Sequence, residues 1–183
     1  MEYGIMIAGF GGQGVLFTGR LLAETALISG YQVTWYPSYG PEQRGGTCHA
    51  AVVISSEPIG SPVVDEPDFL LVLNQPSWER FALTTSKQGY TIYNSDLVKP
   101  ASTAKPGISI PIPASQIAEK AGDARVANMV LFGSFLRVCP EIPIDHAQSS
   151  LRALISPRYE DLLNIDLKCV DMGYAFADNL LSP

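Results

Sequence analysis

Short apolar runs alternate along the chain with longer segments in which apolar residues recur every three or four positions. The short runs predict buried strands, and the periodic segments predict helices that pack on a sheet. The predicted strands are residues 3–8, 32–36, 47–55, 69–73, 90–93 and 108–112, with a further short strand at 63–64. The predicted helices are residues 15–29, 76–83, 115–120, 147–154 and 157–172, with one more that follows Asp123. Asn74 is expected to cap the second helix, and Gly173 to end or bend the last one.

Strands and helices that alternate in this way indicate an α/β fold. We therefore predict a doubly wound, Rossmann-like, mostly parallel sheet with a β-rich excursion near residues 37–68. The chain has 183 residues and is 46% hydrophobic, which is enough to bury a full core in one compact domain. Residues 1–183 are accordingly expected to form a single domain.

Four glycines within six residues separate the first strand from the first helix. Gly9, Gly11 and Gly14 satisfy the G-x-G-x-x-G pattern in a strand-to-helix context, and Gly12 and Gln13 belong to the same turn. Glycine tolerates positive φ angles, and without a Cβ its backbone N–H groups can approach phosphate oxygens closely. The turn is therefore a candidate anion-binding site at a helix N-terminus. The alternative is a tight turn that packs helix on sheet and binds nothing.

Two nucleotide-binding classes are disfavoured by what surrounds this turn. Gly14 is followed by Val15 and Leu16 rather than by the Lys-Ser/Thr of a P-loop, which argues against an NTPase. A dinucleotide-binding fold also needs an acid at the end of its second strand to bind the ribose. Here that strand ends at 33–36 without an acid, which argues against NAD.

A polar and aromatic loop at 37–46 is too elaborate for a plain connector, and its candidate binding residues are Tyr39, Gly40, Pro41, Glu42, Arg44 and Gly45. Loops on a rigid α/β scaffold are where binding sites usually lie. Glu42 and Arg44 are either a charged clamp on a ligand or partner, or an ion pair that stiffens an exposed loop. Asn74 follows a central strand, so we expect it at the same carboxyl edge of the sheet as the glycine turn.

The net charge and the cysteine spacing exclude further classes of partner and site. A net charge of −6 argues against nucleic acid and anionic membranes as partners, and no apolar run approaches the ~20 residues of a membrane span. The three cysteines are far apart without a C-x-x-C pair, so neither a metal or iron–sulfur site nor a disulfide framework is predicted. A reducing cytoplasm fits this usage. Cys48 and His49, as strand neighbours, point to opposite faces, and no catalytic residue is assigned.

Several segments resemble the gamma subunit of 2-oxoacid:ferredoxin oxidoreductases. The similarity lies in residues 9–15, in residues 39–46, and in Pro67-Asp68 leading into 70–74. Residues 128–133 and 164–173 resemble the later helices of the same family. The similarity covers essentially the whole chain. In its short length, the chain is most similar to members of the 2-oxoglutarate branch. Pyruvate, 2-oxoisovalerate and indolepyruvate members carry similar motifs.

The resemblance implies a subunit that is inactive alone, in an enzyme that converts a 2-oxoacid and CoA to acyl-CoA and CO2 and reduces ferredoxin. It places thiamine diphosphate, Mg²⁺ and iron–sulfur clusters on the alpha, beta and ferredoxin-like subunits, so this chain would bind no cofactor alone. The gamma chain would help to bind coenzyme A and complete the assembly. The isolated chain is expected to self-associate through surfaces meant for partners. Two other functions remain open: a free-standing Rossmann-type nucleotide-binding oxidoreductase, and a pure scaffold subunit.

Overall fold

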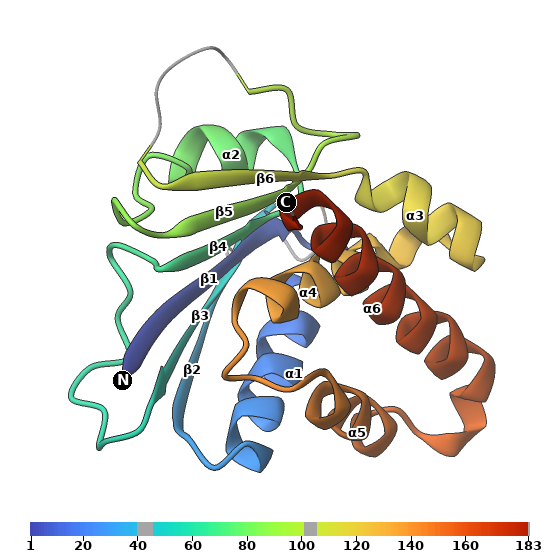
Figure 1. Ribbon diagram of the computed structural model, residues 1–183, viewed down its shortest axis with the longest axis horizontal. Helices are drawn as coiled ribbons and strands as arrows, with labels where there is room; N and C mark the ends of the chain where they lie inside the picture. Colours follow the sequence, from blue (N-terminus) through green and yellow to red (C-terminus); the bar gives the residue numbers. More distant parts are fainter. Residues whose placement is uncertain (40–45, 101–105, 183) are drawn as a thin grey trace.

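A single six-stranded sheet runs through the molecule with helices on both faces (Figure 1). It is seen in a computed structural model that describes residues 1–39, 46–100 and 106–182. The strand order is β2-β3-β1-β4-β5-β6. The strands are β1 (Glu2–Phe10), β2 (Gln32–Tyr39), β3 (Thr47–Ser55), β4 (Phe69–Val72), β5 (Tyr90–Asn94) and β6 (Ile108–Ile112). The α/β class predicted from the sequence is confirmed.

The sheet is mixed, because β3 pairs antiparallel with both of its neighbours, β1 and β2. The pairs β1–β4, β4–β5 and β5–β6 are parallel, so β3 alone runs against the other five strands. The predicted excursion contributes the end of β2, residues 37–39, and all of β3. The short strand predicted at 63–64 is wrong: Val64 instead packs over Gly4, where an added Cβ would lie 2.9 Å from its Cγ1.

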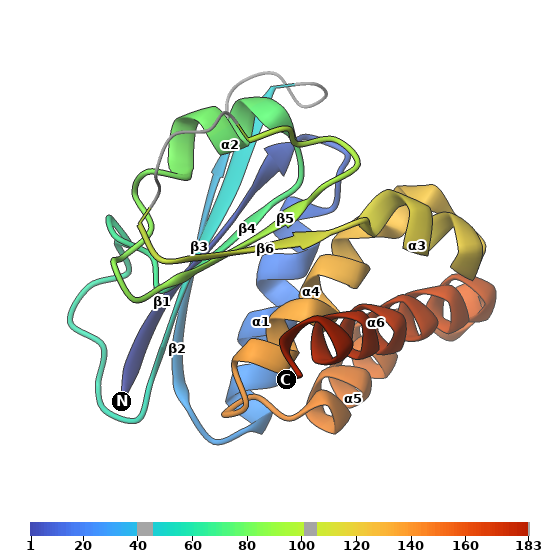
Figure 2. The ribbon, with the colours of Figure 1, turned by 45° about the horizontal axis from the view of Figure 1, so that its top comes forward.

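Helices cover the two faces of the sheet unequally (Figures 1 and 2). One face carries α1 (Val15–Ile28), α4 (Ala127–Val138), α5 (Ile144–Leu154) and α6 (Glu160–Leu181). The short α2 (Gln75–Phe81) lies on the other face, and α3 (Ala114–Ala121) follows β6. The two sides of β1 show this division, since Ile7 belongs to the large core under the helices and Met6 to a small cluster with Trp78 of α2.

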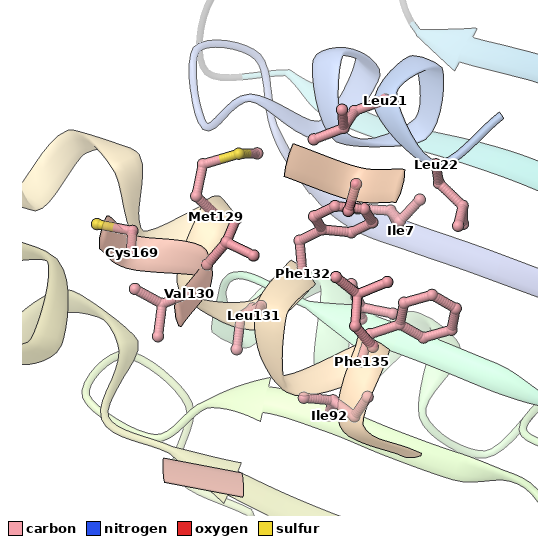
Figure 3. Close-up of a cluster of buried hydrophobic side chains, with 14 of the residues drawn as sticks. Ile7, Leu21, Leu22, Ile92, Met129, Val130, Leu131, Phe132, Phe135 and Cys169 are labelled. Carbon is pink, nitrogen blue, oxygen red and sulfur yellow. The ribbon is translucent and has the colours of Figure 1, made fainter. Parts of the chain in front are cut away.

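The large core is built around α4, whose residues 127–136 are all buried. Figure 3 shows Phe132 and Phe135 of α4 beside Ile7 of β1, Ile92 of β5 and the leucines of α1. The ring centroids of Phe135 and Phe69 lie 5.2 Å apart in an edge-to-face arrangement, which is a favourable aromatic geometry. Residues 127–136 of this central helix are therefore enclosed on all sides by the sheet and the neighbouring helices.

The crossing of α4 and α6 depends on two glycines. A Cβ added to Gly133 would overlap the backbone oxygen of Val170, and a Cβ added to Gly173 would overlap that of Val130. Ser134 completes the contact, since its hydroxyl donates to the backbone oxygens of Val130 and Gly173 at 3.0 Å each. The prediction that the last helix ends at Gly173 is therefore wrong. The glycine permits close packing, and α6 continues to Leu181.

Candidate functional site

The glycine turn joins the end of β1 to the start of α1. Gly12 and Gly14 have φ angles of +99° and +75°, which L-residues with a side chain rarely adopt. The Gln13 N–H donates to the Phe10 oxygen at 3.1 Å and closes the turn. The Gly11 N–H donates to the Gly46 oxygen at 3.1 Å and holds the turn against the start of β3. The positive φ values expected of this motif are therefore present at two of its four glycines.

Gln13 fixes the turn to the end of β4. Its Oε1 accepts two hydrogen bonds, from the Phe10 N–H at 2.8 Å and from Asn74 Nδ2 at 2.7 Å. Asn74 is 5% exposed and also caps α2, because its Oδ1 accepts from the Ser77 N–H at 2.9 Å. The predicted cap is confirmed. The glutamine side chain thus joins the glycine turn to the residue that follows β4, and no local pattern in the sequence indicates this contact.

Asn128 of α4 packs against the glycine turn and the first turn of α1. Its Nδ2 donates to Thr18 Oγ1 at 3.0 Å, and the same amide lies where a Cβ on Gly14 would have to be placed. Thr18 Oγ1 in turn donates to the Gly14 oxygen at 3.0 Å. Turn, first helix and central helix are thus connected through one small polar network. No local sequence pattern indicates a role for Thr18, because its partner Asn128 lies 110 residues away.

The N-terminus of α1 opens into a cavity of about 570 Å³. The cavity is lined by Phe10, Gly11, Gly12, Gly14, Val15, Leu16, Phe17, Tyr39 and Cys48. The helix has no side-chain cap and no acid in its first turn. In the described part of the chain, the N–H groups of residues 15–17 have no acceptor. Unpaired first-turn N–H groups and the helix dipole favour an anion at this position.

The structure brings seven of the predicted site residues to one edge of the sheet. Tyr39 borders the cavity, Asn74 contacts the turn through Gln13, and Gly11, Gly12 and Gly14 line the cavity. Gly9 serves packing, since an added Cβ would lie 2.9 Å from Val15 Cγ2. Five further predicted residues lie outside the described residues, namely Gly40, Pro41, Glu42, Arg44 and Gly45.

A second cavity, of about 480 Å³, borders the same turn. It shares Gly12, Gly14 and Phe17 with the first, and its wall includes Asp166 of α6. Asp166 is 4% exposed, and burial, together with the nearby Asp123 carboxylate, raises its pKa to about 6. The folded chain therefore holds a proton that the unfolded chain releases, and the unfolding free energy falls as pH rises from about 4 to 6. This acid was not among the predicted residues.

The described residues give little support for a nucleophilic cysteine or a metal site. Burial raises the pKa of all three thiols, of Cys169 to about 11, so each is a weak nucleophile at neutral pH. Burial and the charge of Arg80 lower the pKa of His49, which packs on Phe81. Over the described ranges, no three acidic, histidine or cysteine side chains gather as metal ligands. Among those same residues, no helix combines the length and apolarity that crossing a membrane requires.

Comparison with known proteins shows the family to which the chain belongs. The profile described as "Pyruvate ferredoxin/flavodoxin oxidoreductase" matches residues 4–176. The VorA subunit of ketoisovalerate oxidoreductase from Methanothermobacter marburgensis is 38% identical over 180 residues, covering 96% of this chain and 37% of the relative. The KorC subunit of 2-oxoglutarate synthase from the same organism is 34% identical over 168 residues, covering 88% of this chain and 90% of the relative.

A solved structure shows the same fold. The gamma subunit of a keto/oxoacid ferredoxin oxidoreductase from Geobacter sulfurreducens superposes with a TM-score of 0.81 and 26% identity, covering 96% of this chain and 98% of that one. The chain spans only 27% and 37% of the length of the two VorA subunits that it matches. In those relatives the region similar to this chain is therefore one part of a longer polypeptide.

Proposed function

The chain belongs to the pyruvate ferredoxin/flavodoxin oxidoreductase family, and from this premise we propose that it is the gamma-type subunit of a 2-oxoacid:ferredoxin oxidoreductase. The resemblance to these gamma subunits that the sequence predicted is confirmed. The reaction is the conversion of a 2-oxoacid and CoA to acyl-CoA and CO2, with electrons passed to ferredoxin. Thiamine diphosphate, Mg²⁺ and the iron–sulfur clusters are assigned to the alpha, beta and ferredoxin-like subunits.

Coenzyme A is the ligand that we propose for the glycine turn. The observation that carries this proposal is the first turn of α1: residues 15–17 line the 570 Å³ cavity, and their N–H groups have no acceptor in the described chain. The diphosphate of CoA is an anion that suits such a helix N-terminus. Gly12 keeps the approach open, since an added Cβ would meet no atom within 4 Å. The cavity volume lies within the ~300–1,000 Å³ of typical ligand pockets.

The particular 2-oxoacid is a separate question. Both a ketoisovalerate oxidoreductase subunit and a 2-oxoglutarate synthase subunit are more than 30% identical to this chain over most of its length. Within the proposal, the oxoacid binds at thiamine on partner chains, so residues of this chain carry little substrate specificity. Preference for 2-oxoglutarate stays a prediction from the sequence.

Gly12→Ala tests the CoA role. We expect the KM for CoA of the reconstituted complex to rise about tenfold, since the added methyl displaces the diphosphate from the N–H groups that bind it. Alanine at the positive φ angle of position 12 costs about 1–2 kcal/mol of stability, which leaves the chain folded and assembled. The measurement is CoA-dependent reduction of a viologen dye at varied CoA.

The matched control is Gly60→Ala, because Gly60 also has open space around an added Cβ but lacks a positive φ angle. This variant is expected to keep the KM of the unsubstituted complex. A Gly12→Ala complex that assembles poorly yet binds CoA normally would instead support the pure scaffold, in which the turn packs against a partner.

A further inference from the structure

A further groove, of about 310 Å³, lies on the face of the sheet that carries α2 (Figure 2). Its floor crosses three strands, because Met6 of β1 and Tyr36 of β2 both pair with Ala51 of β3. His49 precedes Ala51 by two residues, so its side chain lies on the same face of β3. We call this cavity the His49 groove. It shares no described lining residue with the two cavities at the glycine turn.

One end of the His49 groove is positively charged. The ring centroids of His49 and Phe81 lie 5.2 Å apart, and the guanidinium carbon of Arg80 lies 5.0 Å from the same Phe81 centroid. Among the described residues, Arg80 has no carboxylate within ion-pair distance. In a chain of net charge −6, the groove thus carries a guanidinium without an acidic partner in the described structure.

The other lining of the groove is largely apolar. Met6 and Ala51 form the floor, and Val63 and Val64 belong to the segment that borders it. Val63 is 62% exposed, so a ligand in the groove would remove apolar surface from water. A volume near the lower end of the ~300–1,000 Å³ of typical ligand pockets limits the ligand to a small molecule.

A carboxylate is the ligand group that fits the charged end. A guanidinium binds a carboxylate through two parallel N–H···O bonds, and a protonated imidazole adds a further donor. Asp65 also lines the groove, and together with Glu2 and Glu66 it lines an adjoining cavity of about 400 Å³. Its charge is not among the causes that shift the pKa of His49. The carboxylate is therefore expected beside Arg80 and His49 rather than beside Asp65.

We propose that the His49 groove binds a small carboxylic acid with a short apolar tail, whose carboxylate contacts Arg80 and His49 while the tail covers Met6, Ala51 and Val63. The site is independent of the proposed function, because it shares no described lining residue with the cavity assigned to CoA. A free acid is the source to which the proposal commits. An acidic side chain of a partner subunit presents the same group, and the experiment below distinguishes the two.

The test is an NMR titration of the full chain with isovalerate, with the neutral isovaleramide and with acetate, which lacks the tail. Isovalerate should bind with a Kd of about 1 mM, as expected of a ligand of few atoms, and should shift the amide signals of Met6, His49 and Ala51. Isovaleramide should bind about tenfold more weakly, because it loses the charged hydrogen bonds to Arg80. Acetate should also bind about tenfold more weakly, because it buries less apolar surface.

Arg80→Gln should weaken isovalerate binding about tenfold and remove the preference for isovalerate over isovaleramide. The matched control is Arg152→Gln, which removes the same charge from an exposed position of α5 and should keep the Kd. Arg80 is also exposed and has no ion pair with the described residues, so both variants should melt within about 2 °C of the unsubstituted chain.

Binding should also depend on pH through His49. Burial and the charge of Arg80 lower its pKa in the empty groove, and a bound carboxylate favours the protonated ring. The affinity for isovalerate should therefore rise by about threefold as pH falls from about 8 to about 6. The other charged or titratable side chains that line the groove are Arg80, Tyr36 and Asp65. His49→Gln should remove the pH dependence.

Four results would overturn the inference. These are no signal shifts with isovalerate at tens of millimolar, equal binding of isovalerate and isovaleramide, an unchanged Kd in Arg80→Gln, and binding by the isolated chain that is lost in the complex purified from the native host. The last result would show that a partner subunit, rather than a free acid, fills the His49 groove.

Discussion

Gly173→Ala is expected to lower the unfolding free energy by about 3 kcal/mol or more. An added Cβ would overlap the backbone oxygen of Val130, and backbone atoms in a packed helix crossing cannot move aside as the end of a flexible side chain can. The substitution would also displace Ser134, whose hydroxyl donates to the Gly173 oxygen at 3.0 Å. Urea unfolding followed by circular dichroism measures the change.

Gly60→Ala provides the stability control, because no heavy atom lies within 4 Å of its added Cβ. It should change the unfolding free energy by less than about 0.5 kcal/mol. If Gly173→Ala were as stable as Gly60→Ala, α4 and α6 could not cross as closely as described. The last helix would then be free to end near Gly173, as the sequence pattern suggested.

Gly14→Ala is expected to cost about 2–3 kcal/mol of stability, from two separate causes. The φ angle of +75° is unfavourable for alanine by about 1–2 kcal/mol. The added Cβ would also overlap the Asn128 amide and disturb its hydrogen bond to Thr18. Denaturant unfolding of the single variant measures the sum of the two.

A double-mutant cycle separates these causes. In an Asn128→Ala background the overlap is gone, so Gly14→Ala should cost only the strain of the backbone, about 1–2 kcal/mol. Equal costs in the two backgrounds would contradict the contact between the glycine turn and α4.

The unit formed by β1, the glycine turn and α1 could be predicted from the sequence because its signals are local. An apolar run, glycines at fixed spacing and a periodic helix all occur within the first 29 residues. The cap formed by Asn74 is equally local, since it accepts from the N–H group three residues later. These features need no knowledge of distant segments.

The features that were missed depend on contacts between distant segments. Gln13 reaches Asn74 across 61 residues, and Asn128 reaches Thr18 across 110. Gly173 gives the same local signal whether it ends a helix or lets a second helix pack closely. Asp166 lies among apolar residues of α6 at a buried position, and this break in the pattern was the only local signal of the second pocket.

The antiparallel direction of β3 also could not be predicted from local signals, because alternating strands and helices predict parallel neighbours. β3 pairs with β1 over nine residue pairs and with β2 over eight, and all of these contacts join separate segments of the chain.

Co-purification tests the central claim most directly. The tagged chain, expressed in its native host and recovered at low salt, should bring with it chains that carry thiamine diphosphate and iron–sulfur clusters. The eluate should then reduce a viologen dye in a CoA-dependent manner with one acid among 2-oxoglutarate, pyruvate and 2-oxoisovalerate. A chain that elutes alone, is inactive with all three acids and binds NAD or FAD by titration would contradict the account and identify a free-standing nucleotide-binding protein.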